Sequence, residues 1–232
     1  MKVSSRLRAF AMRYGMNFSR QPTLVQFLKS RKIDTVLDVG ANTGQFARSL
    51  RLSGYAGRIV SFEPTSRVFG LLQSQASSDA GWSVRKEAVG DEAGSLEINI
   101  ARASELSSLA PFSGRADMFG RATEVIGTES VTVVRLDDVL PELPGENFFL
   151  KLDIQGYEKR ALEGARKTLK TLAGVQLELP IVHLYDGGWT FGEAINYMDE
   201  SGFHISQISP TNYIIGDEAS ATEFDVVFRR SE

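Results

Sequence analysis

The chain has 232 residues, of which 42% are hydrophobic and 24% are charged, and its formal net charge is −3. This length and composition predict one globular domain with a short extension, and the slight negative charge argues against a general nucleic-acid binder, because affinity for phosphates requires clustered Lys and Arg. The chain contains no cysteine, which excludes disulfides, cysteine-based zinc sites and a cysteine nucleophile.

The N-terminal segment mixes basic and apolar side chains, as in Arg6, Leu7 and Arg8. This pattern predicts a basic amphipathic helix that packs against the domain, covers the active site or contacts a membrane surface. We therefore divide the chain into a helical extension over residues 1–30 and one domain over residues 31–232. The sequence has neither a secretion-signal core nor an apolar run of the roughly 20 residues that cross a bilayer, so we expect a cytoplasmic protein.

Strand and helix patterns alternate after the extension, which is typical of a parallel sheet with helices on both faces. In chain order we expect strands at residues 33–39, 58–63, 82–89, 131–135, 148–153, 175–179 and 203–208, and helices at 44–52, 66–72, 157–172 and 191–200. A turn at 90–94 predicts that strand 82–89 forms a hairpin with residues 96–100. Residues 213–215 and 224–228 predict a closing antiparallel hairpin. The expected fold is α/β, with a Rossmann-like, mostly parallel sheet of seven strands.

Residues 102–129 interrupt this alternation. They are rich in Ser, Ala, Gly and Arg and show weak periodicity. Connections of this length are usually functional or disordered. The segment is therefore either a mobile loop or an inserted substrate-binding segment.

A glycine-punctuated turn follows the first strand and contains Asp38, Gly40, Asn42 and Gly44. The glycines allow a sharp turn and a close approach of the backbone to a ligand, while Asp38 and Asn42 supply hydrogen-bonding groups. The order Asp-x-Gly-x-x-x-Gly differs from the G-x-G-x-x-G of dinucleotide sites, and its acid would repel a pyrophosphate. This pattern favours S-adenosylmethionine over NAD.

Five carboxylates lie at or near the ends of predicted strands: Asp38, Glu63, Glu87, Asp153 and Glu178. Ligands of open α/β sheets bind outside the carboxyl ends of the strands, so these side chains are expected along one edge. Glu63 follows Asp38 at close to the ~20-residue spacing at which an acid binds ribose hydroxyls. The alternative is that Glu63 only caps the helix that begins near Ser66.

The ordered blocks around these residues resemble the FkbM-type, S-adenosylmethionine-dependent methyltransferases. The matching segments are residues 37–46, 61–64, 87–91, 107–109, 150–158, 177–179, 184–185 and 224–228. They cover nearly all of the chain from about residue 33 onward. The block Lys151-x-Asp153-x-Gln155-Gly-Tyr-Glu is the most specific of them.

The resemblance implies a class I methyltransferase fold and a division of the site into parts. The glycine loop would hold the methionine portion of S-adenosylmethionine, and Glu63 would bind its ribose. Glu87 and Ala88 would lie beside the adenine, and Asp153 would face the reacting methyl group.

Transfer of a methyl group to a hydroxyl requires alignment and a base. Asp153 and Glu178 are the candidate bases, Lys151 could orient a carboxylate or stabilise negative charge, and His183 titrates in the useful range. Lys151 could instead only pair with a neighbouring carboxylate, and His183 could be an ordinary loop residue. The Ser107–Ser108 pair could contact a substrate hydroxyl or cap the following segment. No metal-ligand spacing is found, so no metal is expected.

These observations predict a methyltransferase that methylates a hydroxyl of a small-molecule, sugar or glycan-linked acceptor. The alternatives are a non-catalytic S-adenosylmethionine-binding partner protein and an N-methyltransferase. An NAD-dependent oxidoreductase is disfavoured by the glycine spacing. We expect no nucleic-acid partner and no transmembrane segment, and homo-oligomerisation stays open.

Overall fold

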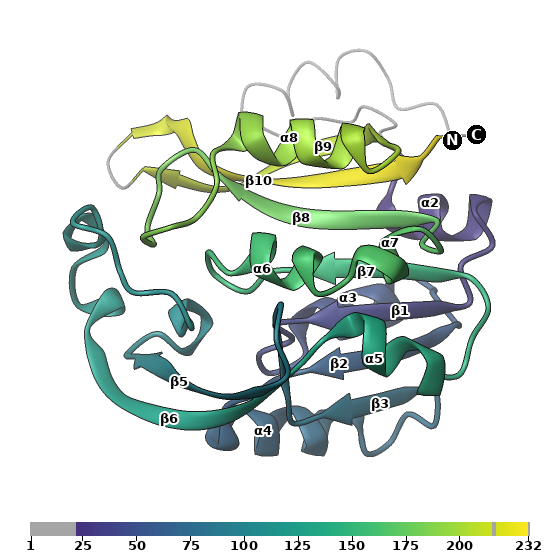
Figure 1. The fold of residues 1–232 in the computed structure, drawn as a ribbon, viewed down its shortest axis with the longest axis horizontal. Helices are drawn as coiled ribbons and strands as arrows, with labels where there is room; N and C mark the ends of the chain where they lie inside the picture. The colour runs from purple at the N-terminus through teal and green to yellow at the C-terminus, as the bar shows by residue number, and fades with distance from the viewer. Residues whose placement is uncertain (1–21, 215–216, 232) are drawn as a thin grey trace, which may run out of the picture.

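The computed structural model describes residues 22–214 and 217–231 (Figure 1). Most of the predicted basic helix lies outside these ranges. Within them, the helix α2 (Leu24–Ser30) begins at a capping box formed by Thr23 and Gln26. Its Phe27 is buried and lies edge-on to Phe149 of the central sheet, with ring centroids 5.8 Å apart. The described end of the predicted extension therefore packs on the domain core.

A seven-stranded sheet in the order β3–β2–β1–β7–β8–β10–β9 forms the centre of the fold. Its strands are β1 (Thr35–Val39), β2 (Arg58–Phe62), β3 (Trp82–Arg85), β7 (Phe148–Leu152), β8 (Gly174–Pro180), β9 (Phe203–Ile214) and β10 (Asp217–Arg230). The first five are parallel, whereas β10 is antiparallel to β8 and to β9. The predicted fold class is confirmed. The two C-terminal strands are longer than expected: β9 continues without a break from the predicted strand 203–208 to Ile214, and β10 begins before the predicted residue 224.

Helices on both sides of the sheet connect its strands (Figure 1). They are α3 (Gln45–Leu52), α4 (Ser66–Ala76), α5 (Leu136–Val139), α6 (Glu158–Glu163), α7 (Arg166–Leu169) and α8 (Phe191–Glu200), with a short 3₁₀ helix η3 (Leu140–Glu142) after α5. The prediction of one helix over residues 157–172 is wrong, because the helix is interrupted at Gly164 and the segment forms α6 and α7. A Cβ on Gly164 would lie 2.0 Å from the carbonyl oxygen of Gly90, and Asp137 accepts hydrogen bonds from the first backbone N–H groups of α7.

A second sheet of three strands corrects another prediction. It contains β4 (Ala88–Val89), β5 (Gly94–Ala101) and β6 (Val125–Val134), in the order β4–β6–β5. The predicted strand 82–89 divides between the two sheets, and β5 pairs with β6 rather than with that strand. The reason is the length of the strands. All of β5 pairs with β6, and the two strands bury a small core, whereas β4 has only two residues to pair with.

The segment between β5 and β6 is described throughout its backbone. It carries two 3₁₀ helices, η1 (Ser104–Leu106) and η2 (Ala116–Thr123). In Figure 1 the β5–β6 hairpin and this segment lie on the side toward which β2 and β3 point. The inserted segment therefore stands at the carboxyl edge of the main sheet, where ligands of open α/β sheets bind.

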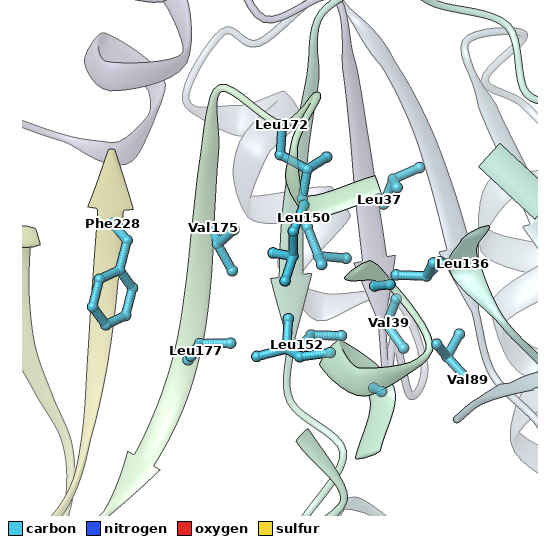
Figure 2. Close-up of a cluster of buried hydrophobic side chains, with 14 of the residues drawn as sticks. Leu37, Val39, Val89, Leu136, Leu150, Leu152, Leu172, Val175, Leu177 and Phe228 are labelled. Carbon is cyan, nitrogen blue, oxygen red and sulfur yellow. The ribbon is translucent and has the colours of Figure 1, made fainter. Parts of the chain in front are cut away.

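The central strands β1 and β7 are buried along their whole length. Figure 2 shows their side chains in one cluster with those of β8 and β10: Leu37, Val39, Leu150, Leu152, Val175, Leu177 and Phe228. Strands that are covered on both faces are near-continuously apolar, as these are. The carboxyl ends of β1 and β7 are thus held by the buried core.

Replacing Leu150 with alanine tests this core. Leu150 is fully buried, so Leu150→Ala should lower the free energy of unfolding by about 2–5 kcal/mol, through lost burial and a cavity. The matched control is Leu52→Ala in α3, whose side chain is 87% exposed. The control should change stability by less than about 0.5 kcal/mol. Urea unfolding followed by circular dichroism measures both, and equal effects would contradict the assignment of the core.

Candidate active site

A cavity of about 580 Å³ lies at the carboxyl ends of the parallel strands, between the main sheet, the second sheet and the inserted segment. Eight of the predicted site residues line it: Gly40, Asn42, Glu63, Glu87, Ala88, Lys151, Asp153 and Glu178. Three others do not, namely Asp38, Gly44 and His183. The structure therefore brings together both halves of the predicted site, the cofactor residues and the candidate bases.

Gly40 is the point at which these halves meet. It has a positive φ of 78°, and a Cβ there would lie 1.8 Å from the backbone carbonyl oxygen of Asp153. Only glycine allows this turn and this approach. Gly44 also has a positive φ, but a Cβ there would meet the ring of Trp82, and the residue serves as the N-cap of α3. Gly44 thus shapes the loop from behind the cavity.

Glu63 is held rigidly at the end of β2. One carboxylate oxygen accepts from the backbone N–H of Asn42 at 3.1 Å, and the other accepts from the N–H and hydroxyl of Thr65. Burial raises the pKa of Glu63, while the hydrogen bonds from Thr65 and Asn42 oppose this rise. Thr65 is the N-cap of α4, but the first N–H of the helix, at Ser66, donates to Glu129 and not to Glu63. The carboxylate lines the cavity and is fixed in orientation.

Asn42 supplies an unsatisfied polar group at the cavity. Its backbone has a positive φ of 46°. Its buried Oδ1 has no hydrogen-bond partner among the described residues. Buried polar atoms are usually paired, so this oxygen suits a ligand that donates a hydrogen bond.

Glu87 and Ala88 form the opposite wall. Glu87 is paired with Arg85, with Nε and Oε2 2.6 Å apart. Ala88 belongs to the core of the second sheet, beside Ile98, and both line the cavity with Leu109. This wall offers an apolar surface with one carboxylate at its edge.

Asp38 lies behind the cavity and is not among its lining residues, so its predicted contact with the cofactor stays a prediction. Its side chain is fully buried and accepts a hydrogen bond from Ser61 at 3.0 Å. The Nζ atom of Lys151 lies 3.5 Å from its other carboxylate oxygen. Burial raises the pKa of Asp38, and Lys151 opposes the rise. The position of Asp38 suits it to hold Lys151 in place.

The candidate bases lie around Lys151. Its Nζ is 3.1 Å from Oδ2 of Asp153 and 5.3 Å from the centre of the Phe46 ring. Burial alone would lower the pKa of Lys151, but Asp153 and Asp38 raise it above its ordinary value. The buried pair predicted as an alternative role of Lys151 is therefore present, and Lys151 also faces the cavity.

The pKa values of Asp153 and Glu178 are shifted in opposite directions. Burial would raise the pKa of Asp153, but Lys151 and the hydrogen bonds from Glu178 and Gln155 hold it below its ordinary value. Burial and the neighbouring Asp153 raise the pKa of Glu178 far above its ordinary value. At neutral pH Asp153 is therefore an ionised proton acceptor, and Glu178 is a neutral acid beside it.

Sequence reasoning missed four cavity residues, Gln155, Gln176, Glu223 and Asp225, as site candidates. Glu223 and Asp225 lie on β10, where Asp225 is directly opposite Glu178 of β8. Burial raises the pKa of both carboxyls. The signal for this pair was their spacing of two within a strand pattern, which places both side chains on one face.

His183 does not line the main cavity. It lies in the loop after β8, and its backbone carbonyl accepts a hydrogen bond from Ser113 at 2.7 Å. It lines a small adjoining hollow together with Glu178 and Tyr185. The predicted catalytic role of His183 has no support from its position.

The inserted segment forms an ordered wall of the cavity. Ser108 donates a hydrogen bond to the backbone carbonyl of Gln155 at 2.6 Å, and Ser107 accepts one from the N–H of Ala101. The ring of Phe112 is stacked on Tyr185 with centroids 5.1 Å apart. The serine pair thus anchors the segment, and the segment closes over the site.

The described residues contain no group of three or more metal-ligating side chains that could hold an ion. No helix in the described ranges is long and apolar enough to span a membrane.

Solved structures resemble this fold. Magnesium protoporphyrin IX methyltransferase (ChlM) from Synechocystis PCC 6803 with bound SAM is 11% identical, with a TM-score of 0.50, over 98% of this chain and 92% of that one. TehB from Haemophilus influenzae is 9% identical, with a TM-score of 0.51, over 96% of this chain and 66% of that one. At these identities the likeness shows the fold alone. A search of curated proteins found no match.

The model of the methyltransferase FkbM domain matches residues 38–205. This range begins at the glycine loop and contains Glu63 and the block from Lys151 to Glu158. It covers well over half of the chain. The chain therefore belongs to the FkbM methyltransferase family and is an S-adenosylmethionine-dependent methyltransferase.

Proposed function

We propose that this protein methylates a hydroxyl of a small-molecule, sugar or glycan-linked acceptor, and that Asp153 receives the hydroxyl proton. The observation that carries the proposal is the Asp153 carboxyl group, held by Lys151 at 3.1 Å, in the same cavity as Glu63 and the glycine loop. A hydroxyl needs a proton acceptor at the moment of transfer, and a fixed carboxylate supplies one.

The residues at the cofactor end fit S-adenosylmethionine. The fixed Glu63 carboxylate suits two ribose hydroxyls, and the unpaired Oδ1 of Asn42 suits a donor group. The turn at Gly40 leaves space that a side chain would fill. The apolar wall around Ala88 suits an adenine ring.

The chemistry at the acceptor end requires few protein groups. When bound, the cofactor supplies an electrophilic methyl group on a sulfonium: a lone pair of the acceptor oxygen forms the new C–O bond, and the S–C bond breaks with its electrons left on sulfur. The hydroxyl proton passes to Asp153. Lys151 and Gln155 hold that carboxylate in place, so that alignment makes a large contribution to the rate.

The charges of the cavity support a neutral acceptor rather than an anionic one. Lys151 is the only basic residue among the described lining residues, and it is already paired with Asp153 and Asp38. Glu178, Glu223 and Asp225 line the same space. A phosphate would find no free cation there. An amine would be attracted, so N-methylation is the second candidate.

Cofactor binding should depend on Glu63. Glu63→Ala removes the expected contact to the ribose, and we expect the affinity for S-adenosylhomocysteine to fall at least about tenfold, because hydrogen bonds to charged groups are strong. The matched control is Glu97→Ala, on the exposed part of β5, which should bind as the wild type does. Isothermal titration calorimetry measures both. Equal affinities in all three proteins would contradict the assigned cofactor site.

Methyl transfer should depend on Asp153. Incubation with radiolabelled S-adenosylmethionine and matched hydroxyl and amine acceptors should label a hydroxyl, and Asp153→Asn should lower the rate by about 100-fold or more. The control is Asp199→Asn, at an exposed side chain of α8. Labelling of amines alone would establish the N-methyltransferase instead. Cofactor binding with no transfer to any acceptor would favour the non-catalytic alternative.

The charge state of Glu178 predicts how stability changes with pH. The folded chain keeps the Glu178 proton above the ordinary carboxyl pKa of 4.5, whereas the unfolded chain releases it, so the free energy of unfolding falls as the pH rises. Glu178→Gln mimics the neutral acid and removes this loss. Because one pH unit corresponds to about 1.4 kcal/mol for one proton and Glu178 keeps its proton at least to neutral pH, the variant should gain about 3 kcal/mol or more relative to wild type between pH 5 and pH 9.

Urea unfolding at the two pH values measures this gain, with Glu200→Gln at the exposed end of α8 as the control. A Glu178→Gln variant whose stability relative to wild type is the same at both pH values would show that Glu178 is ionised in the folded protein.

A further inference from the structure

The side chain of Gln155 bridges the two carboxyl groups of the site. Its Nε2 lies 2.8 Å from Oδ1 of Asp153 and 3.0 Å from Oε2 of Glu178. Gln155 and the following Gly156 both have positive φ, of 56° and 90°. Two successive residues in this region turn the chain sharply after β7, and this turn places the Gln155 amide beside the Asp153 carboxylate. Strained backbone of this kind at a site persists where the surroundings hold it.

Tyr185 holds the other end of this amide. Its hydroxyl lies 2.9 Å from Oε1 of Gln155 and 2.9 Å from the carbonyl oxygen of Leu106 in the inserted segment. A Cβ on Gly156 would lie 2.6 Å from the Cβ of Tyr185, so the absence of that atom lets the tyrosine reach the amide. Tyr185 is 7% exposed.

The hydrogen-bond partners determine how the amide is oriented. Asp153 is ionised beside Lys151, so the atom facing its Oδ1 must be a donor, which is the NH₂ group. The carbonyl of the amide then faces the Tyr185 hydroxyl, which can donate to it. Both N–H donors of the Gln155 side chain are therefore used, one on each carboxyl group, and its carbonyl oxygen faces the Tyr185 hydroxyl.

The charges around the pair come from several elements. Lys151 is on β7 itself, and Asp38 of β1 lies on its far side. Glu223 and Asp225 of β10 act on Glu178. Glu158 at the start of α6 and Glu223 act on Tyr185. Apart from Lys151, all of these neighbouring groups are acidic, and they favour the protonated forms of Glu178 and Tyr185. The donors to Asp153 are thus what keeps it ionised.

We propose that Gln155, held by Tyr185, is the positioning residue of the proton acceptor: its amide fixes the Asp153 carboxylate in place beside Glu178. Asp153 then accepts from Lys151, Gln155 and Glu178, which leaves its orientation little freedom. Naming Asp153 as the acceptor rests on the proposed function, whereas the hydrogen-bonded arrangement does not.

Carbon-13 NMR titration of the full chain, labelled at the carboxyl carbons of Asp and Glu, tests the proposal without any acceptor. Loss of a signal in Asp153→Asn identifies Asp153. In Gln155→Leu the Asp153 carboxylate loses a hydrogen-bond donor, so the midpoint of its titration should rise by about one pH unit. Tyr185→Phe should raise the midpoint by less, because the amide remains but loses its anchor.

Two further variants make the test decisive. Gln155→Asn adopts the left-handed backbone readily but has too short an amide to bridge both groups, so it should raise the midpoint even if the leucine variant does not fold. Gln176→Leu is the matched control, since Gln176 is a buried glutamine of β8 that lines the same cavity but bonds to Asp225. Its effect on the Asp153 midpoint should be below about 0.3 pH units.

An unchanged midpoint in both Gln155 variants would overturn the proposal, because a merely structural glutamine would alter stability and leave the titration alone. With an acceptor in hand, the acid limb of the pH–rate profile in Gln155→Leu should move up by the same amount, while the affinity for S-adenosylhomocysteine stays unchanged. Failure of the proposed function would look different: the midpoint would shift, but Asp153→Asn would not slow methyl transfer.

Discussion

The close contact between Gly40 and the backbone carbonyl of Asp153 is the constraint on which the site depends. Strands β1 and β7 are neighbours in the sheet, and the N–H of Asp153 donates to the carbonyl of Val39 at 3.2 Å. The pairing therefore continues beyond the strand ends and brings two loops together. Because Gly40 has no Cβ, the cofactor loop can touch the segment that carries the proton acceptor. The apolar burial of both strands makes this contact rigid.

The electrostatic arrangement follows from the same contact. Asp38 is the last residue but one of β1, and Lys151 is beside it on β7, in direct register. A buried lysine and a buried carboxylate are tolerated only when they are paired and hydrogen-bonded. Asp38 thus fixes Lys151 from behind, and Lys151 fixes Asp153 at the front. Glu178, which has no cation of its own, stays protonated and donates to Asp153 rather than competing with it.

The sequence was most informative where function depends on backbone geometry. The glycine loop, Glu63 and the Lys151 block could be predicted because a turn with positive φ and a strand-end acid leave local signs in the chain. The positions of Asp38 and Gly44 behind the cavity could not be predicted, since an Asp or a Gly at these places can either contact a ligand or support the loop that contacts it. Only the packing of Trp82 and Lys151 distinguishes these roles.

Other features depend on contacts between distant segments, which single-sequence patterns do not reveal. The inserted segment separates β5 from its partner β6 in the chain. The turn that precedes β5 therefore led to the prediction that it pairs with the strand before that turn. The amide of Gln155 is oriented by Tyr185, 30 residues away in the chain. His183 lies close to the acids in sequence, near the end of β8, yet the loop places it at the small adjoining hollow and not in the main cavity.

A crystal structure of the protein with S-adenosylhomocysteine tests the central claim most directly. The account predicts the ribose hydroxyls on the Glu63 carboxylate, the adenine against the wall of Ala88, and the sulfur directed toward the space beside Asp153. It also predicts that Lys151 and Gln155 keep their contacts with Asp153. A ligand bound elsewhere, or with its sulfur directed away from Asp153, would contradict the account.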